Sequence, residues 1–140
     1  MAVDLVVIDS SAWIFALRPR PHPVVLARVD DLLRVGNGAT VPPVRVELLG
    51  GARTAQERDR LGLRLDALLT IPFVDADWET ATDWSFDLRR QGVTVPTLDL
   101  LIAAPVARVG ALLLHADAHF DMLASRVGLQ VESLVAVIRP

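Results

Sequence analysis

The sequence predicts an α/β fold, a three-layer sandwich in which helices flank a mostly parallel sheet of four to five strands. Short runs of β-branched and other apolar residues alternate with longer segments whose apolar residues recur every three or four positions. Strands that alternate with helices imply right-handed crossovers and a sheet covered on both faces. With 140 residues the chain is long enough for one sizeable core and too short for two ordinary domains, so we expect a single domain over 1–140.

In the first half of the chain, turn and capping residues separate the expected elements. Asp9 and Ser10 are suited to cap a helix after the first strand, and Pro42 and Pro43 fit the first turn of a later helix. The expected elements are a strand at 4–8, a short helix ended by the prolines of 18–23, a helix at 23–35, a short strand at 39–41, a helix from 42 to about 53, and a helix to Thr70 with Leu61, Leu65, Leu68 and Leu69 on one face.

The second half continues the alternation of helices and strands. Thr97 is the expected cap of a long apolar helix, and the run ALLLHAD at 111–117 predicts a buried strand that ends in a carboxylate. The expected elements are a strand or extended segment at 71–74, helices at 75–91 and 97–109, the strand at 111–117, a short helix to about 126, and a last strand near 129–133.

Three acidic residues are expected to meet at one edge of the sheet. Asp9 and Asp117 each end a predicted strand, and the carboxyl ends of parallel strands open into the crevice where ligands bind. Asp99 lies in the first turn of a helix whose N-terminus should reach the same edge, where the helix dipole favours an anion. The sequence therefore predicts an acidic site there.

Glu47 is a fourth candidate, within the predicted helix that begins at Pro42. Gly50 and Gly51 share its face by three- and four-residue spacing, and each glycine costs a helix about 1 kcal/mol relative to alanine. The loss of bulk beside a glutamate favours close approach by another backbone or by a ligand.

Carboxylates gathered in one place require a cation, because they repel each other unless a proton or a metal ion intervenes. The chain has no cysteine, so the ligands must be oxygen or histidine, and Mg²⁺ or Mn²⁺ is the expected ion. Taken singly, Asp9 or Asp99 could be a helix cap, Glu47 a solvated helix residue and Asp117 part of a turn. Only the joint pattern favours a metal site.

Four short motifs resemble the PIN-domain ribonucleases, and specifically the VapC-type toxins of toxin–antitoxin pairs. The similarity covers nearly the whole chain, and the order and separation of the motifs make it specific. The motifs are IDSSAWI at 8–14, VELLGGAR at 46–53, PTLDLLIAA at 96–104 and LLHADAHFDMLA at 113–124. The resemblance implies a PIN-like fold for the predicted sandwich.

The resemblance also implies an activity and a set of site residues. Members of the family cut RNA with Mg²⁺ or Mn²⁺ held by acids, which by match here are Asp9, Glu47, Asp99 and Asp117. A metal-activated water would attack the phosphodiester and leave a 3′-hydroxyl and a 5′-phosphate. Ser11 matches a polar support of the site. His119 stands where many relatives have another aspartate, and since imidazole is a poorer ligand for Mg²⁺ than for Mn²⁺, the number of metals stays open.

The partners implied by the resemblance are RNA, a VapB-like antitoxin and a second copy of the chain. Unpaired RNA loops are the expected substrate, since sequence-specific RNA recognition usually targets them. Arg18, Arg20 and Arg45 are candidate phosphate contacts. The apolar helices at 23–35 and 54–69 could form the groove for the antitoxin tail.

The net charge and the absence of lysine bear on which alternative functions fit this chain. The net charge of −3 gives no general attraction for nucleic acid, and all 14 basic residues are arginine. A phosphoacceptor receiver or an aspartyl phosphatase also places an acid after its first strand, but both use a lysine that this chain lacks. A catalytically inactive PIN domain that binds RNA or protein stays open as the alternative. The first residues lack the basic segment of a signal peptide and no apolar run reaches the roughly 20 residues of a membrane span, so we expect a cytoplasmic protein without membrane contact.

Overall fold

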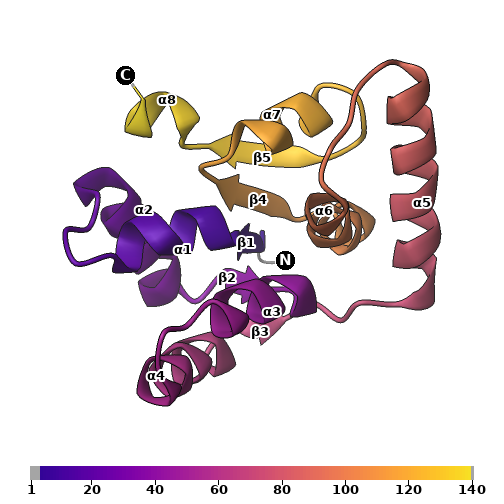
Figure 1. The fold of residues 1–140 in the computed structure, drawn as a ribbon. Helices are drawn as coiled ribbons and strands as arrows, with labels where there is room; N and C mark the ends of the chain where they lie inside the picture. The colour runs from indigo at the N-terminus through magenta and orange to yellow at the C-terminus, as the bar shows by residue number, and fades with distance from the viewer. Residues whose placement is uncertain (1–3, 140) are drawn as a thin grey trace.

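The computed structural model describes residues 4–139, in which the chain forms one sheet of five parallel strands and eight helices (Figure 1). The elements in chain order are β1 (Val6–Ile8), α1 (Ser10–Leu17), α2 (Pro23–Val35), β2 (Gly38–Thr40), α3 (Pro42–Gly50), α4 (Ala55–Asp66), β3 (Leu69–Thr70), α5 (Asp75–Arg90), α6 (Thr97–Val109), β4 (Leu112–His115), α7 (Ala118–Ala124), β5 (Gln130–Ser133) and α8 (Val135–Ile138). The predicted α/β class and parallel sheet are confirmed.

The strand order β3-β2-β1-β4-β5 places β1 at the centre of the sheet. The chain leaves β1 toward β2 on one side and returns later to β4 on the other, so the order reverses between β1 and β4. In an open parallel sheet, ligands bind at this reversal, beyond the carboxyl ends of the strands. Ile8 and Leu114 are paired in register, and so the residues that follow them emerge side by side.

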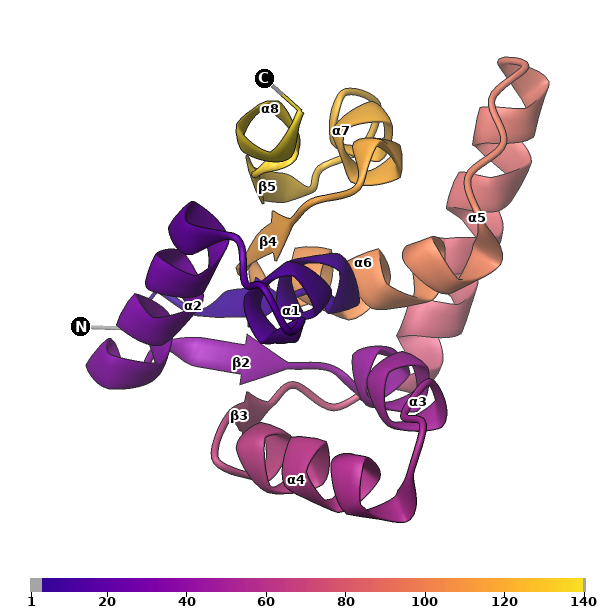
Figure 2. The same cartoon turned by 60° about the vertical axis from the view of Figure 1, so that its left-hand side comes forward.

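Helices cover both faces of the sheet and give the three layers (Figures 1 and 2). α1 and α2 pack together on one face, while α6 packs against β4 on the opposite face. α5 lies outside α6 at the periphery, and α3 and α4 form a pair beside the β3 edge. Because β2, β1 and β4 are the inner strands, their side chains are nearly all buried, among them Val7, Ile8 and Leu114.

The main differences from the predicted elements lie around β3. The predicted helix to Thr70 ends at Asp66, and Leu69 and Thr70 form β3, which pairs with β2 through Ala39 and Thr40. The leucine spacing suggested a continuous helix, but pairing with the sheet edge satisfies the backbone of 69–70 and leaves the Leu69 side chain exposed. The alternative strand at 71–74 is extended chain.

Smaller differences occur at helix ends. Thr97 is the first residue of α6 rather than its cap, and Pro96 occupies the cap position. α3 ends at Gly50, earlier than predicted, and a Cβ placed on Gly50 would meet no atom within 4 Å. No backbone approaches this glycine, and its low helix propensity suits the end of α3; approach by a ligand stays a prediction. α8 was not predicted. No helix within residues 4–139 has the length and apolar character needed to cross a bilayer.

Candidate active site

Asp9 lies at the point where β1 ends and α1 begins, and it serves both elements. Its backbone N–H donates to the carbonyl of Leu114 on β4 (2.9 Å), while its Oδ2 caps α1 by accepting from the Ser11 N–H (2.9 Å). The predicted helix cap and the predicted site residue are thus the same side chain. Its other oxygen, Oδ1, is buried and has no hydrogen-bond donor within residues 4–139.

The Ser11 hydroxyl links the segments that follow β1 and β4. Its hydroxyl donates to Asp9 Oδ2 (2.5 Å) and accepts from the Ala116 N–H, just after β4 (2.9 Å). The hydroxyl therefore fixes the Asp9 carboxylate relative to a segment 105 residues further along the chain. This geometry is that of a support for the site.

Replacing Ser11 by alanine is expected to lower the free energy of unfolding by about 1–3 kcal/mol, because the Ala116 N–H would lose its acceptor inside the protein. Urea denaturation measures this change. Ser11→Thr, which keeps the hydroxyl, is the control and should lose less. A Ser11→Ala protein as stable as the wild type would show that the hydroxyl is not a structural support.

Asp99, Asp117 and His119 form a tight group in which one ligand atom from each lies within 4.8 Å of the others. Asp99 comes from the first turn of α6, Asp117 caps α7 by accepting from the His119 N–H (2.9 Å), and His119 is the second residue of α7. His119 Nδ1 lies 3.2 Å from Asp99 Oδ2 and 3.3 Å from Asp117 Oδ1. Asp99 Oδ2 is buried and accepts no hydrogen bond within residues 4–139, so the contact with His119 is close but not aligned as a hydrogen bond.

Burial and repulsion between neighbouring carboxylates raise the pKa of Asp9 and of Asp99. Burial is the largest cause that raises the pKa of Asp9 to about 6, the hydrogen bonds from Ser11 oppose it, and the charge of Glu47 adds to the rise. Burial also raises the pKa of Asp99 to about 6, and the charges of Asp117, Asp9 and Glu47 raise it further while His119 lowers it. The four acids therefore act on one another.

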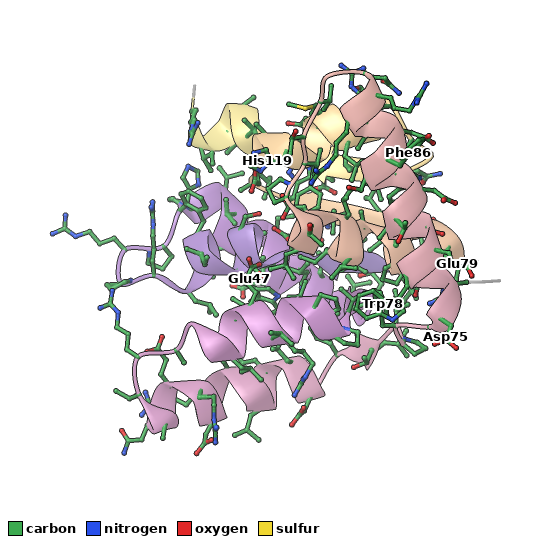
Figure 3. All side chains as sticks on the ribbon, turned by 45° about the vertical axis from the view of Figure 1, so that its right-hand side comes forward. Glu47, Asp75, Trp78, Glu79, Phe86 and His119 are labelled. Atoms are coloured by element: carbon green, nitrogen blue, oxygen red, sulfur yellow. The ribbon has the colours of Figure 1, made fainter. Side chains whose placement is uncertain are left out.

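Glu47 lies outside the tight group. It is exposed on α3 (Figure 3), and it is close enough to Asp9 and Asp99 for its charge to raise the pKa of both. A carboxylate on an exposed helix face can turn toward a cation without the desolvation that Asp9 has already undergone. The structure thus places three of the candidate residues in one group, Asp9 beside them, and Glu47 at the outer rim.

His115 was missed by the sequence analysis. It is fully buried at the end of β4, its Nδ1 accepts the Asp117 N–H (3.1 Å), and its Nε2 lies 3.2 Å from Asp121 Oδ1. Burial lowers the pKa of His115, so the neutral ring can accept from Asp117 on one side and face the carboxylate of Asp121 with its N–H on the other. The signal in the sequence is a histidine that ends a buried apolar run directly before an acid.

The donor set fits a divalent cation. Asp9 Oδ1 and Asp99 Oδ2 are buried oxygens without donors in the described chain, and burial of an anionic oxygen without a partner is costly. Carboxylate oxygens with one imidazole are ligands suited to Mg²⁺ or Mn²⁺, and more to Mn²⁺ as nitrogen enters. Asp99, Asp117 and His119 form the group that could hold such an ion, and Asp9 and Glu47 lie outside this group.

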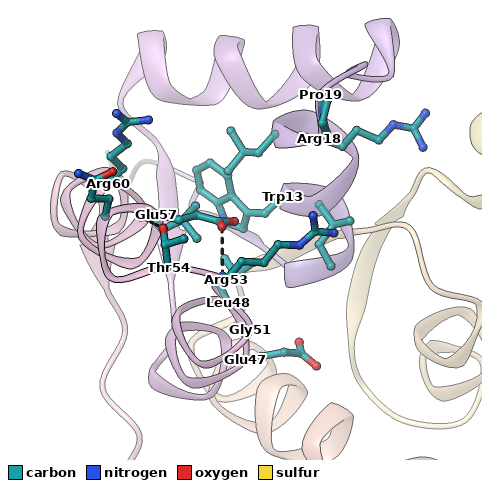
Figure 4. Close-up of a pocket in the computed structure, with 14 residues that line it drawn as sticks. Trp13, Arg18, Pro19, Glu47, Leu48, Gly51, Arg53, Thr54, Glu57 and Arg60 are labelled. Atoms are coloured by element: carbon teal, nitrogen blue, oxygen red, sulfur yellow. Dashed lines mark hydrogen bonds between the residues drawn. The ribbon is translucent and has the colours of Figure 1, made fainter.

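A cavity of about 680 Å³ opens beside Glu47, between α1, α3 and α4 (Figure 4). Apolar side chains line much of the cavity, among them Trp13, Ile14 and Leu48. Arg53 and Arg60 are also among its lining residues. The predicted groove was to lie between the helices at 23–35 and 54–69. α4 does line the cavity, but α2 contributes none of its lining residues, and α1 and α3 take that place.

The candidate phosphate contacts are differently placed. Arg45 is engaged in an ion pair with Asp66 on α4 (3.0 Å). Arg18 lines the cavity, stacks on Phe15 and donates through Nε to the carbonyl of Arg20 (2.7 Å). Neither arginine makes an ion pair with the candidate site acids within residues 4–139.

Comparison with known proteins places the chain in a family. Residues 6–125 match the PIN domain model. The chain is 32% identical over 133 residues to ribonuclease VapC11 of Mycobacterium tuberculosis, covering 92% of this chain and 98% of the relative, and 30% identical to ribonuclease VapC18 of the same organism over 91% and 93%. Its fold is similar to that of VapBC2 from Rickettsia felis, solved with a DNA fragment of its promoter, with a TM-score of 0.76 at 19% identity over 92% of this chain and 98% of that one. The chain belongs to the PIN domain family and groups with its VapC-type members.

Proposed function

We propose that this protein is a divalent-metal-dependent endoribonuclease and the toxin of a toxin–antitoxin pair. The observation that carries the proposal is the group of Asp99, Asp117 and His119 beside Asp9, in which two buried carboxylate oxygens have no donor within residues 4–139. The relatives of about 30% identity are named ribonucleases, which supports the same chemistry here.

The protein's own residues would bind and orient the ion and the RNA. Asp9, Asp99 and Asp117 project from three separate segments into the edge where the strand order reverses, and Ser11 and His115 fix the backbone on which Asp9 and Asp117 stand. When bound, Mg²⁺ or Mn²⁺ supplies a nucleophilic water and compensates charge on the phosphodiester. Glu47, which is exposed on α3, would complete the ligand set.

RNA cleavage that stops on addition of EDTA tests this proposal. Purified protein with Mn²⁺ is expected to cut a single-stranded RNA loop, and Mg²⁺ to support lower activity, because His119 favours Mn²⁺. The activity should return when excess Mn²⁺ replaces the chelated ion. Cleavage that persists in EDTA would exclude the metal-dependent reaction, and RNA binding without cleavage under all these conditions would favour the inactive RNA-binding alternative.

The cavity beside Glu47 is the proposed place for a VapB-like antitoxin tail. It offers apolar lining to an apolar anchor, and Glu47 among its lining residues suits an arginine of the tail. The Rickettsia felis neighbour is a VapBC complex, which supports a partner of this kind. The gene for the partner is expected to adjoin this one.

Replacing Ile14 by aspartate is expected to weaken binding of that adjoining gene's product at least about tenfold, since Ile14 is an exposed apolar residue in the cavity and a charge there must be desolvated. Co-purification and titration of the two proteins measure the loss. Val46→Asp, at an exposed apolar residue of α3 outside the cavity lining, is the matched control. Equal weakening by both variants would place the partner elsewhere.

The remaining partner expected of a VapC-type protein is a second copy of itself. We propose a homodimer, which sedimentation of the purified protein over a range of concentrations would test.

A further inference from the structure

Two of the three residues of the tight group stand at the start of α7, a helix of seven residues that packs against β5 (Figure 1). A helix this short is not stable by itself, so contacts with the rest of the protein must fix its position. Phe120 and Leu123 bury one side of α7. Apolar burial is not directional, however, and does not by itself set how the helix is turned.

His115 supplies directional contacts between the end of β4 and α7. Its ring is 0% exposed and lies beside the ring of Phe120, with centroids 5.3 Å apart. Nδ1 accepts from the Asp117 N–H (3.1 Å), and Nε2 lies 3.2 Å from Asp121 Oδ1. One buried ring therefore contacts both the cap of α7 and a residue one turn further along the helix.

The bond from the Asp117 N–H determines which ring nitrogen of His115 carries the proton. A nitrogen that accepts a hydrogen bond carries none, so the proton of the neutral ring is on Nε2. Nε2 faces the Asp121 carboxylate, close to it but without the alignment of a full hydrogen bond. A negative charge at this nitrogen favours the tautomer that leaves Nδ1 free to accept from Asp117.

Asp121 is in turn held from the neighbouring strand. The Ser133 hydroxyl of β5 donates to Asp121 Oδ2 (2.9 Å), and the N–H of Leu134 donates to the carbonyl of His115 (2.8 Å). A continuous set of contacts thus runs from the end of β5 through the ring to the cap of α7. We call its members Ser133, Asp121, His115 and Asp117 the His115 network.

Packing alone does not explain a histidine at this position. A fully buried imidazole has two ring nitrogens that need partners, and a leucine would fill space beside Phe120 without that requirement. What a leucine would lack is an acceptor for the Asp117 N–H. The bond to Asp117 is therefore the property that distinguishes His115 from an apolar core residue.

We propose that His115 is a positioning residue for the ion site and that Asp121, held by Ser133, acts through it. Asp117 Oδ1 accepts from the His119 N–H (2.9 Å), so the two side chains keep a fixed relation and a shift of α7 moves both relative to Asp99. The inference rests on the proposed metal-dependent function and deepens it. Residues that orient metal ligands without touching the ion commonly change metal affinity about 10–100-fold when they are replaced.

Binding of Mn²⁺ to the full chain without RNA tests the role of His115. His115→Leu is expected to raise the Mn²⁺ dissociation constant at least about tenfold. His115→Asn is the matched variant, because its Oδ1 can take the place of Nδ1 as acceptor, and it should recover much of the affinity. Asparagine also leaves the ring's apolar contacts empty, so urea denaturation should show it to be no more stable than His115→Leu. Affinities that merely follow stability would overturn the positioning role.

The tautomer of His115 gives a second test that needs no substitution at the site of interest. Long-range proton–nitrogen correlation spectra of the metal-free wild type should show the ring proton on Nε2. His22→Asn and His119→Asn remove the signals of the other two histidines and so identify that of His115. A proton on Nδ1 would overturn the inference, because that nitrogen could not accept from the Asp117 N–H.

A double-variant comparison tests whether Asp121 acts through His115. Asp121→Ala should weaken Mn²⁺ binding, and His115→Leu/Asp121→Ala should bind Mn²⁺ as His115→Leu does, since the route to Asp117 is already lost. Asp30→Ala, at an exposed acid of α2, is the control and should leave the affinity unchanged. An Asp121→Ala effect that is equal in both backgrounds would be attraction of the ion by charge alone, and it would overturn the assignment of Asp121, as would no effect at all.

These measurements separate failure of this inference from failure of the proposed function. A wild type that binds no Mn²⁺ would overturn the metal-dependent function and the positioning role with it. A wild type that binds Mn²⁺, together with His115→Leu of equal affinity, would overturn the positioning role alone.

Discussion

Replacing Asp99 by asparagine is expected to lower metal-dependent RNA cleavage at least about 100-fold while the protein stays folded. A bound divalent ion supplies several kcal/mol of transition-state stabilisation, and each 1.36 kcal/mol is a factor of ten in rate. Within the tight group, Asp99 is acted on by the charges of Asp117, Asp9 and Glu47. Loss of its charge should therefore weaken the binding of the ion directly.

The fold should survive because asparagine has nearly the same shape as the aspartate it replaces. In the metal-free protein at neutral pH, Asp99→Asn removes a buried negative charge from a repulsive cluster, so its free energy of unfolding should equal or exceed that of the wild type. The measurements are cleavage rates with Mn²⁺ and unfolding in urea. Asp30→Asn, at an exposed acid of α2, is the control for removal of a charge as such. An Asp99→Asn protein that cleaves RNA at the wild-type rate would refute the catalytic role of the cluster.

The metal-free protein is expected to lose stability as the pH rises from about 4 to above 6. The pKa of Asp9 and that of Asp99 are raised from 3.8 to about 6 in the folded state. Between these values the folded state binds more protons than the unfolded state, so the free energy of unfolding falls with rising pH and reaches its lower plateau above pH 6. A shift of about two units corresponds to roughly 3 kcal/mol at most for each group, and because the two groups interact the effects are not additive.

Urea denaturation in EDTA at pH 5 and pH 7.5 measures this effect, and a double variant Asp9→Asn/Asp99→Asn isolates it from all other titrating groups. The wild type should gain stability relative to the double variant at pH 5. Addition of Mn²⁺ at pH 7.5 should stabilise the wild type by about 2.7 kcal/mol when the ion is at 100 times its dissociation constant, and should not stabilise the double variant. A difference in free energy of unfolding between the wild type and the double variant that is the same at both pH values would show that ionisation of Asp9 and Asp99 does not destabilise the fold.

The position of the acids could be predicted because it follows from topology. Parallel strands carry whatever follows them to one edge, so a sequence in which Asp9 and Asp117 each end an apolar run already indicates their neighbourhood. The helix dipole and the first-turn position made Asp99 a member of the same set. Helix caps and candidate site residues could not be separated from the sequence, and at Asp9 the cap of α1 and the candidate site residue are the same side chain.

The failures share a physical cause, which is that local patterns do not report long-range partners. The leucines at 65, 68 and 69 have helical spacing, but the free edge of β2 competes for the backbone of Leu69 and Thr70. His115 does lie in the predicted buried strand, but only the turn of the chain after β4 brings the Asp117 N–H and Asp121 to its two ring nitrogens. Glu47 was correctly placed on a helix, yet its distance from the tight group depends on how α3 packs, which periodicity does not give.

The hydroxyl of Ser11 has a practical consequence for spectroscopy. Because the Ala116 amide proton is held by that hydroxyl, which also holds Asp9, its nuclear magnetic resonance signal reports on both segments at once. Its exchange with deuterium measures how often the two segments separate, without any ion or nucleic acid in the sample. Exchange of this one amide proton therefore reports whether the Ala116 segment stays in contact with the segment of Asp9 and Ser11.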